Sequence, residues 1–261
     1  MIIPAGGLAG FCAASAGLGA ILGSFLGVVA ERLPAQVREE EGAGNLLFPP
    51  SHCPTCQHRL RWWENIPLVS WLMLRGRCRC CRSPIPLRVW MVELLSALFF
   101  GLSAWLMSDL PALLALWVLW CGLLPLAMID LRERLLPDCL TQPLLWVGLL
   151  IHLHTHLLPL ADALYGAVAG YLALWLVYQG HRLITGREGL GYGDFKLLAA
   201  LGAWCGWQAL PSVLLLAALG GILGWAICFK HHDHDNVIPF GPFLAFAGLV
   251  IFISQHACFT F

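Results

Sequence analysis

Long apolar stretches separated by short polar connections dominate the pattern of this chain. A helix needs about 20 mostly apolar residues to cross the hydrocarbon core of a bilayer. Eight segments approach this length, and the sixth of them is short: 6–30, 89–108, 111–130, 139–158, 162–184, 195–208, 211–229 and 240–258. We therefore predict an all-α polytopic membrane protein with about eight transmembrane helices. Small residues in the first segment suit close packing against a second helix.

One stretch interrupts the apolar pattern. Residues 31–88 are polar, rich in arginine and proline, and hold most of the clustered cysteines. The stretch is long enough to form a small folded insert. We expect three parts: a first transmembrane helix at 1–30, a Cys-rich insert at 31–88, and a membrane domain at 89–261.

The composition agrees with a membrane protein. Of the 261 residues, 59% are hydrophobic and only 11% are charged, whereas a soluble globular chain carries roughly 25% charged residues. The formal net charge is zero, so nothing in the composition favours a nucleic acid as a partner. We expect the lipid bilayer to surround most of the chain.

The basic residues predict the orientation. Lys and Arg are concentrated in cytoplasmic loops. All 15 of them fall in or beside one set of alternate connections, which comprises 31–88, 131–138, 185–194 and 230–239. We therefore expect the Cys-rich insert to face the cytoplasm and both termini to lie on the other side.

The insert contains two C-x-x-C units. Cys53 and Cys56 form the first, and Cys78 and Cys81 form the second. Paired units at this separation are typical of zinc ribbons, in which four thiolates converge on one tetrahedral ion. Cytoplasmic thiols stay reduced, which makes disulfides a weaker interpretation. The spacing predicts a structural zinc site.

Other ligands are compatible with the same stretch. Cys80 lies within the second unit and offers other pairings, although a free thiol is its simplest interpretation. His52 and His58 flank the first unit and are possible substitutes for a cysteine. The "HHDHD" tract at 231–235 could also bind a metal, but a solvated loop is the more common role of such a tract.

Two carboxylates lie at the cytoplasmic ends of predicted spans. Asp130 closes "WVLWCGLLPLAMID", and Asp194 follows "GLGYG" at the start of the next helix. A lone carboxylate is costly to bury. Two neighbouring carboxyls keep one proton between them, so one can activate water while the other polarises a carbonyl. The glycines give the backbone conformational freedom and permit close approach. Asp130 and Asp194 are therefore a candidate catalytic pair.

Alternatives to this pair remain open at this point. Asp138 competes with Asp130 as the partner of Asp194, although its place after Pro137 also suits a helix N-cap. Glu93, just inside the second span, is either a packing residue or a snorkelling one. A transporter would use Asp130 and Asp194 as proton or cation sites, but such acids usually lie nearer mid-membrane.

A series of sequence blocks resembles one known family. In order, they are "GSFLGVVAERLP", "SHCPTC", "WWENIPLVSWL", "RGRCRCC", "PLRVWMVELLSAL", "IDLRERLLPDCLTQPLLW", "GLGYGDFKLLAALGAWCGW" and "IPFGP". Together they resemble the bacterial type IV prepilin peptidases, also called leader peptidase/N-methyltransferases. The blocks span nearly the whole chain, and their joint occurrence is specific.

The resemblance implies an activity and a place. Members of this family are aspartyl endopeptidases of the bacterial inner membrane. They cut the short cytoplasmic leader from type IV prepilins or type II secretion pseudopilins, and many then methylate the new N-terminus with S-adenosylmethionine. The resemblance makes Asp130 and Asp194 catalytic, matches Asp138 to a non-catalytic acid, and makes zinc ligands of Cys53, Cys56, Cys78 and Cys81. It places methyl transfer on the insert, where Gly76 is a weak candidate for binding the methyl donor.

Overall fold

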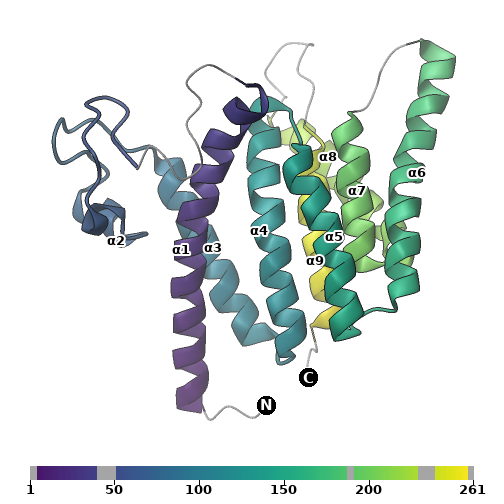
Figure 1. The fold of residues 1–261 in the computed structure, drawn as a ribbon, viewed down its shortest axis with the longest axis horizontal. Helices are drawn as coiled ribbons and strands as arrows, with labels where there is room; N and C mark the ends of the chain where they lie inside the picture. The colour runs from purple at the N-terminus through teal and green to yellow at the C-terminus, as the bar shows by residue number, and fades with distance from the viewer. Residues whose placement is uncertain (1–4, 40–50, 187–190, 229–238, 258–261) are drawn as a thin grey trace. The chain divides into compact units, whose positions relative to one another are not determined.

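The computed structural model describes residues 5–39, 51–186, 191–228 and 239–257. These residues form helices joined by short connections, and none of them belongs to a strand. The chain divides into two compact units, of which the first lies within Met1–Ser108 and the second is Asp109–Ala257 (Figure 1). The 231–235 tract falls outside the described residues.

Each of the eight predicted spans contains a helix, which confirms the all-α prediction. The first unit holds α1 (Ala5–Val37), η1 (Trp62–Asn65), α2 (Val69–Met73) and α3 (Leu87–Leu106). The second holds α4 (Leu110–Glu133), α5 (Asp138–Thr155), α6 (Leu160–Thr185), α7 (Tyr192–Cys205), η2 (Trp207–Ala209), α8 (Leu210–Cys228) and α9 (Gly241–His256).

Within the described residues, five stretches are long and apolar enough to cross a bilayer: Gly7–Val37, Leu87–Leu106, Leu110–Glu133, Leu160–Thr185 and Trp207–Ala226. Helix α9 is apolar but shorter, and α7 has only 14 residues. A helix of that length extends about 21 Å, which is less than the hydrocarbon core. Its residues from Leu197 to Cys205 are all buried, so protein rather than lipid surrounds most of α7.

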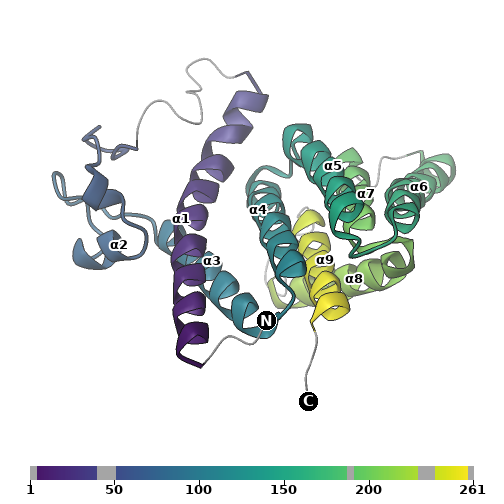
Figure 2. The same cartoon turned by 60° about the horizontal axis from the view of Figure 1, so that its bottom comes forward.

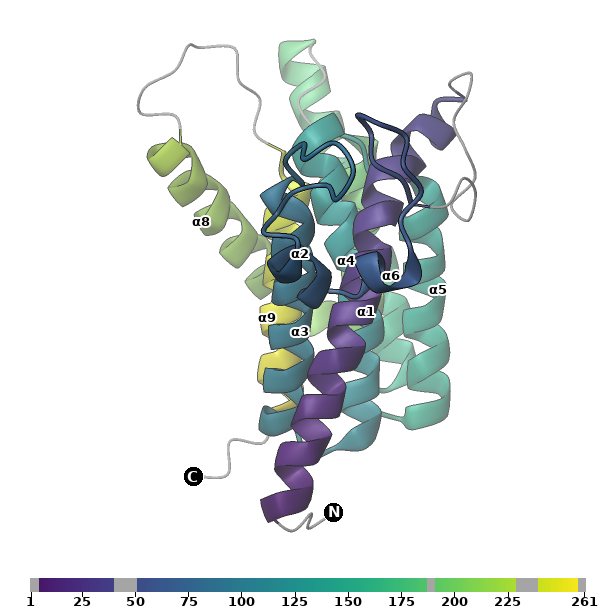
Figure 3. The same ribbon diagram turned by 90° about the vertical axis from the view of Figure 1, so that its left-hand side faces the viewer.

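In the first unit, α1 and α3 run alongside each other over much of their length (Figure 3). Glycines of α1 make the approach close, as the small residues of the first segment predict. A Cβ atom added to Gly23 would lie 2.8 Å from the Cβ of Ser96, and one added to Gly19 would lie 2.8 Å from the Cβ of Phe100. No larger residue fits at either glycine without moving α3.

In the second unit, α7 is the central helix and packs against α5, α6 and α9 (Figure 2). Its contact with α6 is the closest, because Gly166 and Gly202 face each other backbone to backbone. Near the start of α7, the rings of Tyr192 and Phe195 pack on Tyr178 of α6, with centroids 5.2 and 5.7 Å from the Tyr178 ring. This packing fixes where α7 begins, which in turn places Asp194.

The glycine contact between α6 and α7 yields a stability prediction. In Gly202→Ala, the new methyl group would meet the carbonyl oxygen of Gly166, and overpacking of this kind costs about 1–3 kcal/mol. We expect a lower midpoint of thermal unfolding in detergent. Gly180→Ala is the matched control, because Gly180 also lies in a helix but has open space around it. A Gly202→Ala protein that melts with Gly180→Ala would contradict the packing described here.

Candidate functional site

Asp130 lies in the last turn of α4 and is only 5% exposed. Its Oδ2 atom accepts a hydrogen bond of 3.0 Å from the backbone N–H of Gly241, the first residue of α9. Asp194 is half-buried in the first turn of α7, whose N-cap is Gly191. The two acids share a neighbour, because the side chain of Leu136 lies against both Gly241, which binds Asp130, and Gly193, which precedes Asp194. The structure therefore brings the two predicted acids together.

Two glycines, Gly193 and Gly241, leave the space that lets the residues around Asp130 and Asp194 approach each other. A Cβ atom on Gly241 would lie 2.6 Å from Oδ2 of Asp130. One on Gly193 would lie 2.7 Å from the Cβ of Leu136, and the added Cβ on Gly241 would also lie 3.3 Å from Cδ2 of Leu136. Leu136 is thus the common neighbour of both glycines. Neither glycine has a positive φ, so close approach, and not conformational freedom, is the reason for glycine here.

Asp138 takes a different position from the one that its sequence context suggests. Pro137 is the N-cap of α5, and no side chain caps the helix, so the N-cap interpretation of Asp138 is wrong. Both carboxylate oxygens of Asp138 instead accept hydrogen bonds of 2.7 Å from Nζ of Lys196. The pair is solvent-accessible, with 60% of the Asp138 side chain exposed. Asp138 is therefore engaged by a lysine two residues beyond Asp194.

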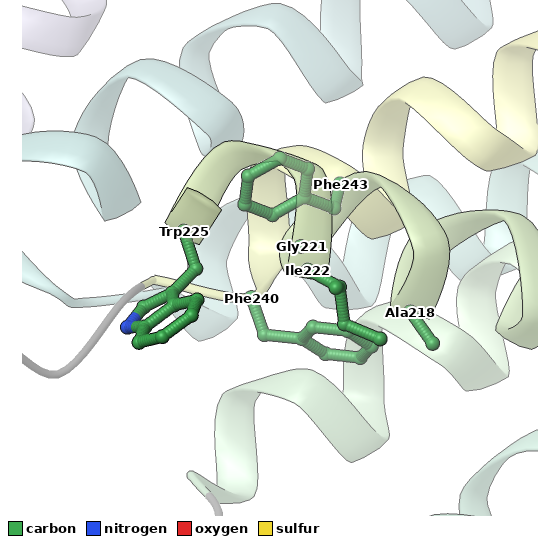
Figure 4. Close-up of a pocket in the computed structure, with 6 residues that line it drawn as sticks. All are labelled: Ala218, Gly221, Ile222, Trp225, Phe240 and Phe243. Atoms are coloured by element: carbon green, nitrogen blue, oxygen red, sulfur yellow. The ribbon is translucent and has the colours of Figure 1, made fainter. Parts of the chain in front are cut away.

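An apolar cavity lies close to the acid pair, between α8 and the start of α9. Its volume is about 300 Å³, and its lining comprises Ala218, Gly221, Ile222, Trp225, Phe240 and Phe243. Figure 4 shows the rings of Phe240, Phe243 and Trp225 around the hollow, with Ile222 between them. Phe240 directly precedes Gly241, which contacts Asp130. One wall residue of the cavity is thus the chain neighbour of the residue that binds Asp130.

The second candidate site is the cysteine cluster of the first unit. The sulfur atoms of Cys53, Cys56, Cys78 and Cys81 all lie within 4.8 Å of one another, and all four cysteines are free. The Cys53–Cys81 and Cys56–Cys78 sulfur distances are 3.7 and 3.9 Å. Ligands at about 2.3 Å from a tetrahedral zinc ion stand about 3.8 Å apart. The donor set therefore fits one such ion.

Two matching turns create the cluster. In the first, the N–H of Cys53 donates to the carbonyl oxygen of His58, and the carbonyl oxygen of Cys53 accepts from the N–H of Gln57, both at 2.9 Å. The second turn repeats both bonds around Cys78. Each turn also closes with an isolated β-bridge. The repeated backbone geometry aims both thiols of each C-x-x-C unit at the same point.

The remaining candidate ligands lie outside the cluster. Cys80 is exposed and occupies the position in the second turn that Thr55 occupies in the first. Among the described residues, the cluster includes neither Cys80 nor His52 nor His58. The Nε2 atom of His58 instead lies 3.5 Å from a carboxylate oxygen of Glu64.

Sequence reasoning missed two polar residues that support the cluster. Glu64 is buried; it accepts a 2.9 Å hydrogen bond from the N–H of Arg61 and lies 3.7 Å from the guanidinium of Arg79. The Arg61 hydrogen bond lowers the pKa of Glu64. The Ser83 hydroxyl lies 3.1 Å from the sulfur of Cys81 and lowers the pKa of that thiol. The only sequence signal for Ser83 is its place two residues after a cysteine.

Glu93 packs against the insert instead of snorkelling. It is buried in the second turn of α3, and its Oε2 atom accepts a 2.7 Å hydrogen bond from the backbone N–H of Leu68. Leu68 has a φ of +62°, a conformation that rarely suits a residue with a side chain. The buried acid thus stabilises the strained backbone that precedes α2.

Two family models and several relatives match this chain. The model of the bacterial peptidase A24 N-terminal domain covers residues 18–107, and that of the type IV leader peptidase family covers 116–227. Proteins named prepilin leader peptidase/N-methyltransferase from Stutzerimonas stutzeri and Aeromonas hydrophila are each 49% identical to it. The first alignment covers 89% of this chain and 87% of the relative, and the second covers 88% and 86%.

A Klebsiella pneumoniae protein with the same name is 52% identical over 77% of this chain and 87% of its own length. No solved structure matches the chain.

Proposed function

This chain belongs to the type IV leader peptidase family, and from that premise we propose that it is an aspartyl endopeptidase that cuts the leader from type IV prepilins or type II secretion pseudopilins. One observation supports the proposal: Asp130 and Asp194 lie at the ends of two helices that meet around Leu136. The comparisons give no support to a transporter. A transporter also usually places its acids nearer mid-membrane.

The place of action follows from the same chain. We infer that the enzyme lies in the bacterial inner membrane, with the acid pair on the cytoplasmic side. The support is the distribution of arginine and lysine, all of which lie in or beside one set of alternate connections. A pilin leader is short and cytoplasmic and precedes an apolar helix, so its scissile bond meets the acids at the membrane surface.

The geometry suits general acid and base catalysis. The ionised carboxyl of the pair takes a proton from the attacking water, and the protonated carboxyl donates a hydrogen bond to the scissile carbonyl oxygen. The C–N bond then breaks, and the leaving amine takes a proton from the pair. The N–H of Gly241 holds one oxygen of Asp130 and so orients this carboxyl for the reaction.

The apolar cavity suits the substrate's first apolar side chain after the cut. Phe240 belongs to its wall and adjoins Gly241, so a side chain in the cavity would bring the neighbouring peptide bond toward Asp130. Burial of an apolar side chain of this size contributes roughly 1.5–3 kcal/mol. We infer that this contact helps to set the cleavage position.

The relatives' name also implies methyl transfer. We infer that the chain methylates the new N-terminus, with S-adenosylmethionine supplying the methyl group when it is bound. Gly76, the weak candidate for binding this donor, has a structural reason for being glycine. Its φ is +66°, and a Cβ there would lie 2.8 Å from the Trp71 ring, so packing and turn geometry account for the glycine.

We also infer that the four cysteines hold zinc. Their spacing fits a tetrahedral ion, and four thiolates leave no position open for a substrate, so the role is structural. Such a site compensates for the small core of an insert of this size.

The catalytic pair is tested by substitution. We expect Asp130→Asn and Asp194→Asn each to abolish leader cleavage of a purified prepilin, because each removes one half of an acid–base unit. The double variant should be no worse than either single variant, since residues that act as a unit are not additive. Mass spectrometry of the pilin product measures the result.

Asp138→Asn is the matched control for the catalytic pair. It breaks only the accessible ion pair with Lys196, which contributes at most about 1 kcal/mol. Its cleavage activity should remain near that of the unmodified enzyme. Loss of cleavage in folded Asp138→Asn, with activity kept in Asp130→Asn, would show that the wrong acid has been paired with Asp194.

Cleavage and methylation should separate by mutation. If the insert performs methyl transfer, Asp194→Asn should still methylate a pre-cut pilin that has a free N-terminus, although it no longer cuts the precursor. The measurement is the mass of the pilin after incubation with S-adenosylmethionine. A folded Asp194→Asn protein without methylation of pre-cut pilin would place both activities at one site.

Zinc content tests the cysteine cluster. Elemental analysis of the purified protein should find about one zinc per chain, by the stoichiometry of four thiolates. Cys53→Ser combined with Cys78→Ser should lose the metal, because one ligand of each turn is then gone. Cys80→Ser should keep it, since Cys80 is exposed and outside the cluster. Full metal content in the double variant would refute the site.

A further inference from the structure

The insert exposes an unusual number of large apolar side chains. They come from η1, α2 and the turn between them: Trp62, Trp63, Ile66, Val69, Leu72 and Met73. Trp62 is 76% exposed and Met73 is 77% exposed. Exposed apolar groups clustered in this way mark contact with a protein or a membrane. We call these six residues the apolar face of the insert.

The contacts of α2 place this face beside a membrane helix. The indole rings of Trp71 and Trp90 pack with centroids 5.5 Å apart, and Glu93 holds the N–H of Leu68. Trp90 and Glu93 belong to the first two turns of α3. Glu93 therefore lies about 9 Å along the helix axis from Leu87, at a rise of 1.5 Å per residue. The apolar face is therefore held against the first two turns of an apolar helix, at the end that the insert joins.

The charge of the insert matches an anionic lipid surface. The whole stretch 31–88 contains nine arginines and five acids. Its 51–88 part contains one acid, Glu64, against seven arginines: Arg59, Arg61, Arg75, Arg77, Arg79, Arg82 and Arg88. The guanidinium of Arg61 lies 5.2 Å from the centre of the Trp63 ring, so positive charge directly adjoins the apolar face. Tryptophan beside arginine is typical of the membrane interface, where the ring enters the headgroup layer and the cation binds phosphate.

We propose that the apolar face of the insert lies in the interface of the bilayer and contacts anionic phospholipids. A lipid occupant is favoured over a protein because the face adjoins α3, which itself presents Met91, Leu95 and Leu98 to its surroundings. The apolar face and the adjoining helix thus both expose large apolar side chains, and Arg61 adjoins the face. The insert then contacts the membrane surface directly, in addition to its covalent attachment to the two flanking helices.

A fluorescent amino acid tests this position in the full chain. Met73 is replaced by the environment-sensitive residue Anap, and the purified protein is reconstituted into vesicles of phosphatidylglycerol and phosphatidylcholine with brominated acyl chains. The 12 tryptophans of the chain make intrinsic fluorescence unsuitable. Bromine near the headgroups should quench Met73→Anap roughly twofold, because the side chain then lies at the shallow acyl boundary. Thr55→Anap is the control, since Thr55 is exposed on a cysteine turn.

The outcomes distinguish lipid from the alternatives. Blue-shifted emission of Met73→Anap that bromine does not quench would show that protein covers the face and would overturn the proposal. Water-like emission would overturn it too, as would equal quenching of Thr55→Anap. Vesicles of phosphatidylcholine alone should give weaker quenching of Met73→Anap. Equal quenching in both vesicles would overturn the claim that the arginines favour anionic lipids. Leu72→Anap repeats the test if Met73→Anap does not yield a monodisperse protein.

Discussion

A carboxyl group at the edge of an apolar helix needs a hydrogen-bond donor, and the backbone N–H of Gly241 meets that need for Asp130. This bond can form only if α9 begins beside the end of α4, because a backbone N–H, unlike a long side chain, cannot extend toward a distant acceptor. Leu136 then fills the space between Gly241 and Gly193, so the start of α7 must come to the same place. Three helix ends and one loop are thus fixed by a single buried acid.

The cysteine insert is stabilised in a different way: hydrogen-bonded backbone turns, rather than a large apolar core, hold it together. Each turn orients two thiols through the same pair of N–H to carbonyl bonds. Glu64 joins the turns, since His58 comes from the first and Arg79 from the second. Glu93 then attaches the segment before α2 to a membrane helix. The insert is therefore held both by its cysteine turns and by contacts with α3.

The predictable features are those that depend on composition and spacing. Apolar length located the helices, and paired C-x-x-C units located the cysteine cluster, because both are local properties of the chain. The roles of Asp138 and Glu93 were not predictable, since each depends on a distant partner, Lys196 or Leu68. The contact of Gly241 was not predictable for the same reason, since its partner Asp130 lies more than a hundred positions away.

The short length of α7 has a consequence for water. At about 21 Å, this helix cannot reach across a hydrocarbon slab of about 30 Å, so at least one of its ends lies inside that slab. Backbone groups at a helix end cannot remain dry and unpaired, and here Asp194 occupies the first turn. Hydrolysis consumes a water molecule at that point. Asp194 is only half-buried, so water can reach the first turn of α7, while the apolar part of the substrate stays in the bilayer.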